Sequence, residues 1–205
     1  MPKRARPDPP SLRVLSFDPG LRNLGVARVV VKDGEIQILE TFGVYDIFEA
    51  SGQPCANVRK APADQTVLAA LDTMALKHPD WLDTKPDIVV IESQIGKKEN
   101  AVAAALLAAC ATHFPTALCM YMGAMGKFKT VKRPELVGDK AHRHKILKEA
   151  AIEFAQKALE HAPPALEHFQ SLGKKMEHVA DCILQAMSVH KTPKVRRMLK
   201  AAGGR

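Results

Sequence analysis

The first forty residues constrain the fold most, because they encode three short strands joined by turns. Residues 12–17 form an apolar run that ends at Asp18-Pro19-Gly20, which is common turn chemistry. Residues 25–31 predict a second strand, and Asp33-Gly34 is the residue pair of a tight hairpin that returns the chain as a third strand over 36–42. We therefore expect three consecutive antiparallel strands, the first of which ends at a carboxylate.

Strand and helix patterns alternate in the rest of the chain. Residues 87–92 contain four consecutive branched aliphatic side chains, which is typical of a strand covered on both faces. The remaining segments are a loop at 46–62, a helix at 63–78, an alanine-rich helix at 101–110, a strand at 116–121, a mobile basic loop at 122–140, and helices at 139–159 and 174–189. This order predicts an α/β fold with a mixed five-stranded sheet flanked by helices. We expect one domain over 12–190, preceded by a disordered basic arm at 1–11 and followed by a basic tail at 191–205.

The excess of basic over acidic side chains lies entirely in the second part of the chain. The 205 residues carry a formal charge of +8, but residues 1–121 hold 13 basic and 14 acidic side chains, whereas residues 122–205 hold 17 and 8. Such a balance favours a polyanionic partner. No apolar run reaches the ~18 residues of a membrane span, so no membrane partner is expected. The four cysteines show no metal-binding spacing, which indicates reduced thiols and an intracellular protein.

Three carboxylates lie at positions typical of a catalytic site, two at strand ends and one on a helix. Asp18 ends the first predicted strand and Glu92 ends the doubly buried one, so both point into one crevice if these strands are parallel neighbours. Each has a plainer explanation, as a turn residue or as a polar strand end. On the last predicted helix, His178 and Asp181 face the same way because they are three residues apart. That polar stripe could equally be a solvated helix face.

Oxygen ligands from two strand ends and one helix, with at most one imidazole, suit Mg²⁺ or Mn²⁺ better than a closed zinc site. A pair of such ions about 3.5–4 Å apart can activate water and neutralise charge on a scissile phosphate. The basic second part of the chain would then hold the rest of a nucleic-acid backbone.

Three motifs in this order resemble the RuvC-like Holliday junction resolvases of the RNase H-like superfamily, especially the branch of poxviruses, related large DNA viruses and fungal mitochondria. The first motif is Ser16-Phe-Asp18-Pro-Gly-Leu-Arg-Asn23-Leu-Gly25, the second is Ile91-Glu92-Ser93-Gln94, and the third runs from Lys174-Lys175 to Asp181. The resemblance extends from about residue 12 to residue 190. It implies an RNase H-like fold, with Asp18, Glu92 and Asp181 as catalytic metal ligands.

The third motif departs from the family pattern of two aspartates. His178 stands at the three-residue spacing that some bacterial members fill with histidine, and Glu177 stands at the four-residue spacing. We therefore predict His178 as the fourth catalytic and metal-binding residue, with Glu177 as its rival. A histidine must be neutral to bind metal, so activity should fall at acid pH.

The resemblance further implies a homodimer that uses Mg²⁺, or Mn²⁺ as a substitute, with two ions in each active site. Paired nicks in opposite strands of a four-way junction or other branched DNA would leave 5′-phosphates. Basic side chains that we expect to contact DNA phosphates are Lys127, Lys129, Lys132, Arg133, Lys140, Arg143, Lys145, Lys148, Lys174 and Lys175. The family favours a viral replication site in the cytoplasm, or the nucleus, over a mitochondrion.

Three other functions stay open on the sequence alone. The same carboxylates could serve an RNase H-like nuclease with another substrate, such as a ribonuclease or a transposase-like enzyme. The histidine in the third motif could mark a branched-DNA-binding module without catalysis. An actin-like nucleotide-binding fold also begins with Asp and Gly in a hairpin, but 205 residues are too few for its usual two halves.

Overall fold

A computed structural model describes residues 10–53, 55–77, 81, 83, 85–132 and 135–203. Its strands are β1 Leu12–Pro19, β2 Asn23–Lys32, β3 Glu35–Asp46, β4 Ile88–Ser93 and β5 Leu118–Gly123. Its α-helices are α1 Ile47–Ala50, α2 Ala63–Asp72, α4 Lys97–His113, α5 Lys140–Leu159, α6 Pro163–Ser171, α7 Met176–Ser188 and α8 Pro193–Gly203. A π-helical turn, Thr73–Lys77, extends α2. None of the helices within these described ranges is long and apolar enough to cross a bilayer.

The five strands form one mixed sheet in the order β3-β2-β1-β4-β5. β1, β2 and β3 are antiparallel, while β4 pairs in parallel with both β1 and β5. The expected fold class is therefore confirmed. β1 and β4 are parallel neighbours, which is the condition under which Asp18 and Glu92 share one crevice. The chain between these strands includes α1 and α2.

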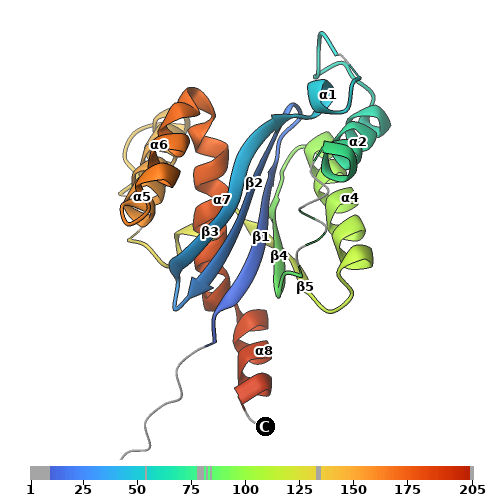
Figure 1. Ribbon diagram of the computed structural model, residues 1–205. Coiled ribbons are helices and arrows are strands. Elements are labelled where there is room, and N and C mark those ends of the chain that lie inside the picture. Colours follow the sequence, from blue (N-terminus) through green and yellow to red (C-terminus); the bar gives the residue numbers. More distant parts are fainter. Residues whose placement is uncertain are drawn as a thin grey trace, which may run out of the picture.

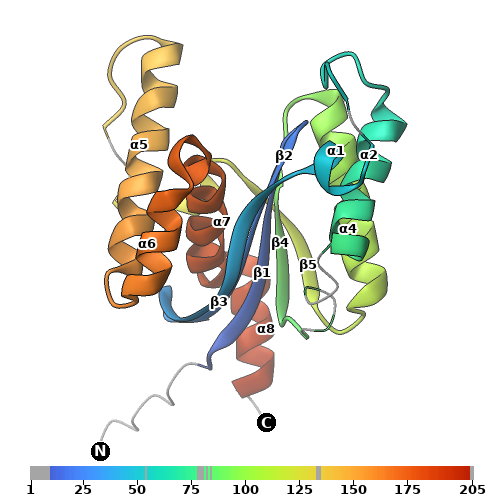
Figure 2. The same cartoon turned by 45° about the horizontal axis from the view of Figure 1, so that its top comes forward.

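Helices cover both faces of the sheet. Figure 1 and Figure 2 show α5, α6 and α7 on one face and α1, α2 and α4 on the other. Each interface holds its own apolar cluster, because alternate residues of a strand point to opposite faces. In β4, Ile88 and Val90 belong to the cluster under α7, whereas Val89 and Ile91 belong to the cluster under α4. The prediction of a strand covered on both faces is thus confirmed.

Several segments differ from the expectation in detail. The loop expected at 46–62 begins with α1, whose first N–H groups are capped by the carboxylate of Asp46. The basic loop expected at 122–140 contains a 3-10 turn, Gly126–Phe128, in which Lys127 and Phe128 are buried. The C-terminal basic segment contains α8, which buries Val195 and exposes its cationic face. All four cysteines are unpaired.

Some residues of the expected segments lie outside the described residues. They are residues 1–9 of the basic arm, Pro54 of the loop expected at 46–62, His78 of the helix expected over 63–78, residues 133–134 of the basic loop and residues 204–205 of the tail. The boundaries of the arm, the domain and the C-terminal tail stay predictions from the sequence.

Candidate active site

Strand alternation places Asp18 and Glu92 on the same face of the sheet. Val14 of β1 and Val90 of β4 belong to the apolar cluster under α7, and Asp18 and Glu92 lie an even number of residues further along. The two strands are in register at Phe17 opposite Ile91, so the two carboxylates occupy the next position of the same ladder. Both are buried, with 7% of their surface exposed.

Helix α7 brings the third carboxylate to these strand ends. It crosses β2 next to Gly25, which pairs with Asp18 in the sheet. A Cβ atom at Gly25 would lie 2.8 Å from the backbone oxygen of His178 and 3.0 Å from its Cβ atom, so only glycine lets the helix approach this closely. One turn further along α7, Asp181 points at the ends of β1 and β4.

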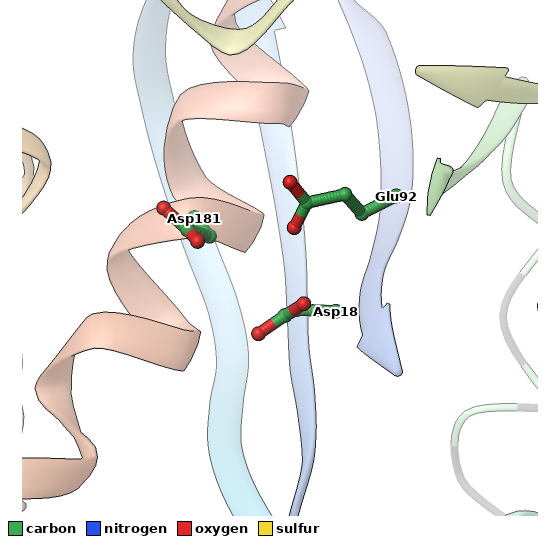
Figure 3. A group of neighbouring side chains, drawn as sticks. All are labelled: Asp18, Glu92 and Asp181. Atoms are coloured by element: carbon green, nitrogen blue, oxygen red, sulfur yellow. The ribbon is translucent and has the colours of Figure 1, made fainter. Parts of the chain in front are cut away.

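The third carboxylate completes a group of three, Asp18, Glu92 and Asp181, which we call the acidic cluster. Their carboxyl groups converge (Figure 3), and one oxygen atom of each lies within 4.8 Å of the others. Lys127 joins them from the 3-10 turn: its Nζ atom lies 2.6 Å from Asp181 Oδ2 and 3.3 Å from Glu92 Oε1. Sequence reasoning expected Lys127 at a DNA phosphate, whereas the structure places it, 7% exposed, against these carboxylates.

Burial and mutual repulsion set the protonation of the cluster. Burial, strengthened by the charges of Asp18 and Asp181 and opposed by Lys127, raises the pKa of Glu92 to about 8. Burial also raises the pKa of Asp181 despite the Lys127 ammonium. For Lys127, burial opposes the charged form, but the attraction of Asp181 and Glu92 outweighs it and raises the pKa. The lysine is therefore charged.

His178 and Gln94 hold the two oxygen atoms of Asp18. His178 Nδ1 lies 2.7 Å from Oδ2, and Gln94 Nε2 donates to Oδ1 at 3.3 Å. Asn23 Nδ2 lies 3.4 Å from His178 Nε2, so a neutral ring would accept there and donate through Nδ1 to Asp18. Burial alone would raise the pKa of Asp18 and lower that of His178, but their hydrogen bond and opposite charges reverse both directions.

The two candidates for a fourth ligand lie differently. His178 contacts Asp18 directly, whereas Glu177 Oε2 accepts a hydrogen bond from Lys148 Nζ at 2.6 Å. Glu177 Oε1 lies 3.8 Å from His178 Nε2, so both side chains border the cluster. The choice of His178 over Glu177 as fourth ligand stays a prediction.

The acidic cluster opens into a cleft of about 400 Å³. Besides the cluster, the cleft is lined by Ile95, Met125, His144 and Lys148, among others. Sequence reasoning missed the first three of these. His144 could have been found, because it shares one helical stripe of α5 with Lys140 and Lys148 at a spacing of four residues. Ile95 carries no comparable pattern, although it is fully exposed beside the motif of Glu92.

The other predicted DNA-contacting residues lie at the surface, except that Arg133 is outside the described residues. Lys129, Lys132, Lys140, Arg143, Lys145, Lys174 and Lys175 are exposed, and Lys148 is half-buried beside Glu177. Four of them, Lys140, Arg143, Lys145 and Lys148, lie on the first half of α5, which borders the cleft. The structure thus gathers part of the predicted basic surface beside the acidic cluster.

The donor set of the acidic cluster fits a hard divalent cation. Three carboxylates offer oxygen atoms only, which are the ligands that Mg²⁺ and Mn²⁺ prefer. Burial is the largest cause of the raised pKa of Glu92, and the charges of Asp18 and Asp181 add to it against the opposing charge of Lys127. A divalent cation bound here would favour the ionised carboxylates.

Comparison with known proteins supports the fold. No protein-family model and no curated protein sequence matches the chain. The structure of the yeast mitochondrial Holliday junction resolvase Ydc2 superposes with a TM-score of 0.56 at 13% identity, covering 96% of this chain and 88% of that one. The structure of Thermus thermophilus RuvC superposes with a TM-score of 0.50 at 17% identity, covering 93% of this chain and 96% of that one. With strand order, helical layers and these likenesses in agreement, the chain has the RuvC-like form of the RNase H-like fold.

Proposed function

We propose that the chain is a metal-dependent endodeoxyribonuclease that resolves Holliday junctions and other branched DNA by paired nicking, leaving 5′-phosphates. The observation that carries this proposal is the convergence of Asp18, Glu92 and Asp181 at the ends of two parallel strands and one helix. A protein of the same fold, the yeast Ydc2 protein, is a Holliday junction resolvase by name.

Asp18, Glu92 and Asp181 would hold Mg²⁺ or Mn²⁺, with two ions in each site and His178 as fourth ligand. A bound divalent cation supplies Lewis acidity, which lowers the pKa of water and stabilises charge on a phosphate. Gln94 and His178 orient the carboxylate of Asp18 through both of its oxygen atoms. His144 and Lys148, which also line the cleft, would hold the DNA backbone there.

The exposed cations of α5 would bind the arms of the junction. Phosphate contacts position a nucleic acid without reading its bases, so the proposed selectivity is for branched shape. Two copies of the chain would be needed for paired cuts, and a homodimer is therefore part of the proposal. Its molecular mass in solution, measured by light scattering, tests that part.

The compartment is a separate question. A viral replication site in the cytoplasm, or the nucleus, stays a prediction from the sequence, and the yeast protein of similar fold is mitochondrial by name. Microscopy of the tagged chain in its host distinguishes these compartments.

A cleavage assay tests the activity. The purified chain is incubated with Mg²⁺ and either a four-way junction or a linear duplex of matched sequence, beside Asp18→Asn and the control Asp64→Asn. Asp64 is exposed in the first turn of α2, on the other side of the sheet. We expect symmetric nicking of the junction by the wild type and the control, and none by Asp18→Asn.

Other outcomes would select a rival function. Equal cutting of linear DNA or of an RNA–DNA hybrid would replace the resolvase proposal with a nuclease of another specificity. Tight junction binding without cleavage in either Mg²⁺ or Mn²⁺ would indicate the non-catalytic binding module.

A further inference from the structure

Lys127 contacts two of the three carboxylates that form the acidic cluster. Its ammonium contacts Asp181 Oδ2 at 2.6 Å and Glu92 Oε1 at 3.3 Å, and 7% of the residue is exposed. Both of these carboxylates belong to the group whose oxygen atoms come within 4.8 Å of one another. The ammonium therefore bridges two of the three carboxylates that a bound cation would contact.

The backbone of Lys127 is fastened to the helix that carries Asp181. The hydroxyl group of Ser188 donates to the Lys127 carbonyl oxygen at 2.7 Å, and Thr130 Oγ1 lies 2.7 Å from the same hydroxyl. Ser188 is fully buried and stands seven residues after Asp181, on the same side of α7. The next residue, Phe128, is buried in the apolar cluster under α7. Lys127 is thus held at both ends, unlike a surface lysine that reaches an acidic group by chance.

An ammonium and a divalent cation cannot share these two carboxylates in the same way. Mg²⁺ binds oxygen atoms at about 2.0–2.1 Å, which requires it to lie between them. The ammonium already makes charge-assisted contacts there, and it would repel an incoming cation at short range.

We propose that Lys127 is an internal counter-ion of the acidic cluster, which balances Asp181, and Glu92 when that carboxyl group is ionised, in the metal-free chain and is displaced when a divalent cation binds. This inference rests on the proposed metal site. It follows that Lys127 stabilises the metal-free fold and lowers the affinity of the site for Mg²⁺ and Mn²⁺.

Mn²⁺ binding without DNA tests the proposal, with calorimetry or the electron paramagnetic resonance of free Mn²⁺ as the readout. We compare the wild type with Lys127→Met and with Lys194→Met, a control whose lysine is exposed on α8. Metal binding to the wild type must break the charge-assisted hydrogen bonds of Lys127, whereas Lys127→Met has none to break. We therefore expect Lys127→Met to bind Mn²⁺ more tightly by about tenfold or more. The control should bind Mn²⁺ as the wild type does.

Thermal unfolding gives a second readout. In EDTA, Lys127→Met should unfold at a lower temperature than the wild type, and Mn²⁺ should raise its melting temperature more. If Lys127→Met folds only with Mn²⁺, that result also supports the proposal. If it does not fold at all, Lys127→Gln, which keeps a hydrogen-bond donor without the charge, takes its place with the same expectations.

The results separate this inference from the proposed function. Equal Mn²⁺ affinity in the wild type and in the Lys127 variants would overturn the counter-ion role and leave the metal site intact. Absence of Mn²⁺ binding in every variant, with Asp18→Asn indistinguishable from the wild type, would overturn both.

Discussion

Metal binding to the acidic cluster should depend steeply on pH, because Glu92 holds a proton at neutral pH. Burial, together with the neighbouring charges of Asp18 and Asp181, raises its pKa to about 8 although Lys127 opposes the shift. A carboxylate must lose its proton before it can ligate a metal, so the proton and the cation compete. Affinity should therefore rise with pH up to about 8 and then level off.

The size of this effect follows from the pKa. With a value of about 8, roughly one tenth of the metal-free protein has an ionised Glu92 at pH 7 and roughly one hundredth at pH 6. The apparent dissociation constant for Mn²⁺ should then fall by about fiftyfold between pH 6 and pH 8. Binding at pH 7 should release close to one proton from this group.

Calorimetry at pH 6, 7, 8 and 9, in buffers of different ionisation enthalpy, measures the affinity and the proton release together. His178 adds to the dependence, since its raised pKa means that its ring also binds a proton before metal. The series is therefore repeated with His178→Ala, in which the remaining dependence belongs to the carboxylates. A dissociation constant that does not change between pH 6 and pH 8 in that variant, without proton release, would refute the reasoning.

Three further predictions concern stability and DNA binding. Glu92→Gln should stabilise the metal-free protein at pH 9. The protonated Glu92 of the folded chain contributes stability that is complete below its unfolded pKa of 4.5 and is lost as the pH rises through its folded pKa of about 8, and this shift corresponds to roughly 5 kcal/mol at most. A melting temperature in EDTA no higher than that of the wild type would contradict this prediction. Gly25→Ala should lower the free energy of unfolding in urea by about 1–3 kcal/mol, since its Cβ would press on His178, and unchanged stability would show that α7 can shift freely. Lys140→Ala and Arg143→Ala should each weaken junction binding and reduce the slope of its salt dependence by about 0.9, as fluorescence anisotropy would detect; an unchanged slope would remove that residue from the DNA surface.

The arrangement of the sheet could be predicted from the sequence because it depends on local patterns. The Asp33-Gly34 turn joins two strands, and the apolar run of 88–91 determines another by itself. Parallel pairing of β1 with β4 then follows from the helical crossover between them, which brings Asp18 and Glu92 to one edge. The resemblance identified Asp181, which the structure places with them.

The place of Lys127 could not be predicted, because its burial depends on residues far along the chain. Its partner Glu92 lies 35 residues earlier, and the surrounding segment 122–140 contains glycine, lysine and arginine residues that are typical of an exposed basic loop. A lysine is buried only where carboxylates compensate its charge, and that compensation appears only after the fold has formed. Asn23 and Gln94 belong to the motifs, but their contacts with His178 and Asp18 could not be predicted for the same reason, since each contact crosses from one element to another.

The position of the acidic cluster follows from apolar residues more than from the acidic residues themselves. In β4, Val89 and Ile91 are fully buried on one face and Ile88 and Val90 on the other, so a slip of one residue would exchange the two sets. Such a slip would also point Glu92 toward the apolar cluster under α4 and away from Lys127, and burying an unpaired charge is strongly unfavourable. The apolar alternation thus determines the register, and the register determines where the carboxylates meet. Two chains with 13% identity can therefore share this fold as long as the alternation and the close approach of α7 at Gly25 persist. Differences in substrate between such chains should then arise from the loop residues and the α5 residues that line the cleft.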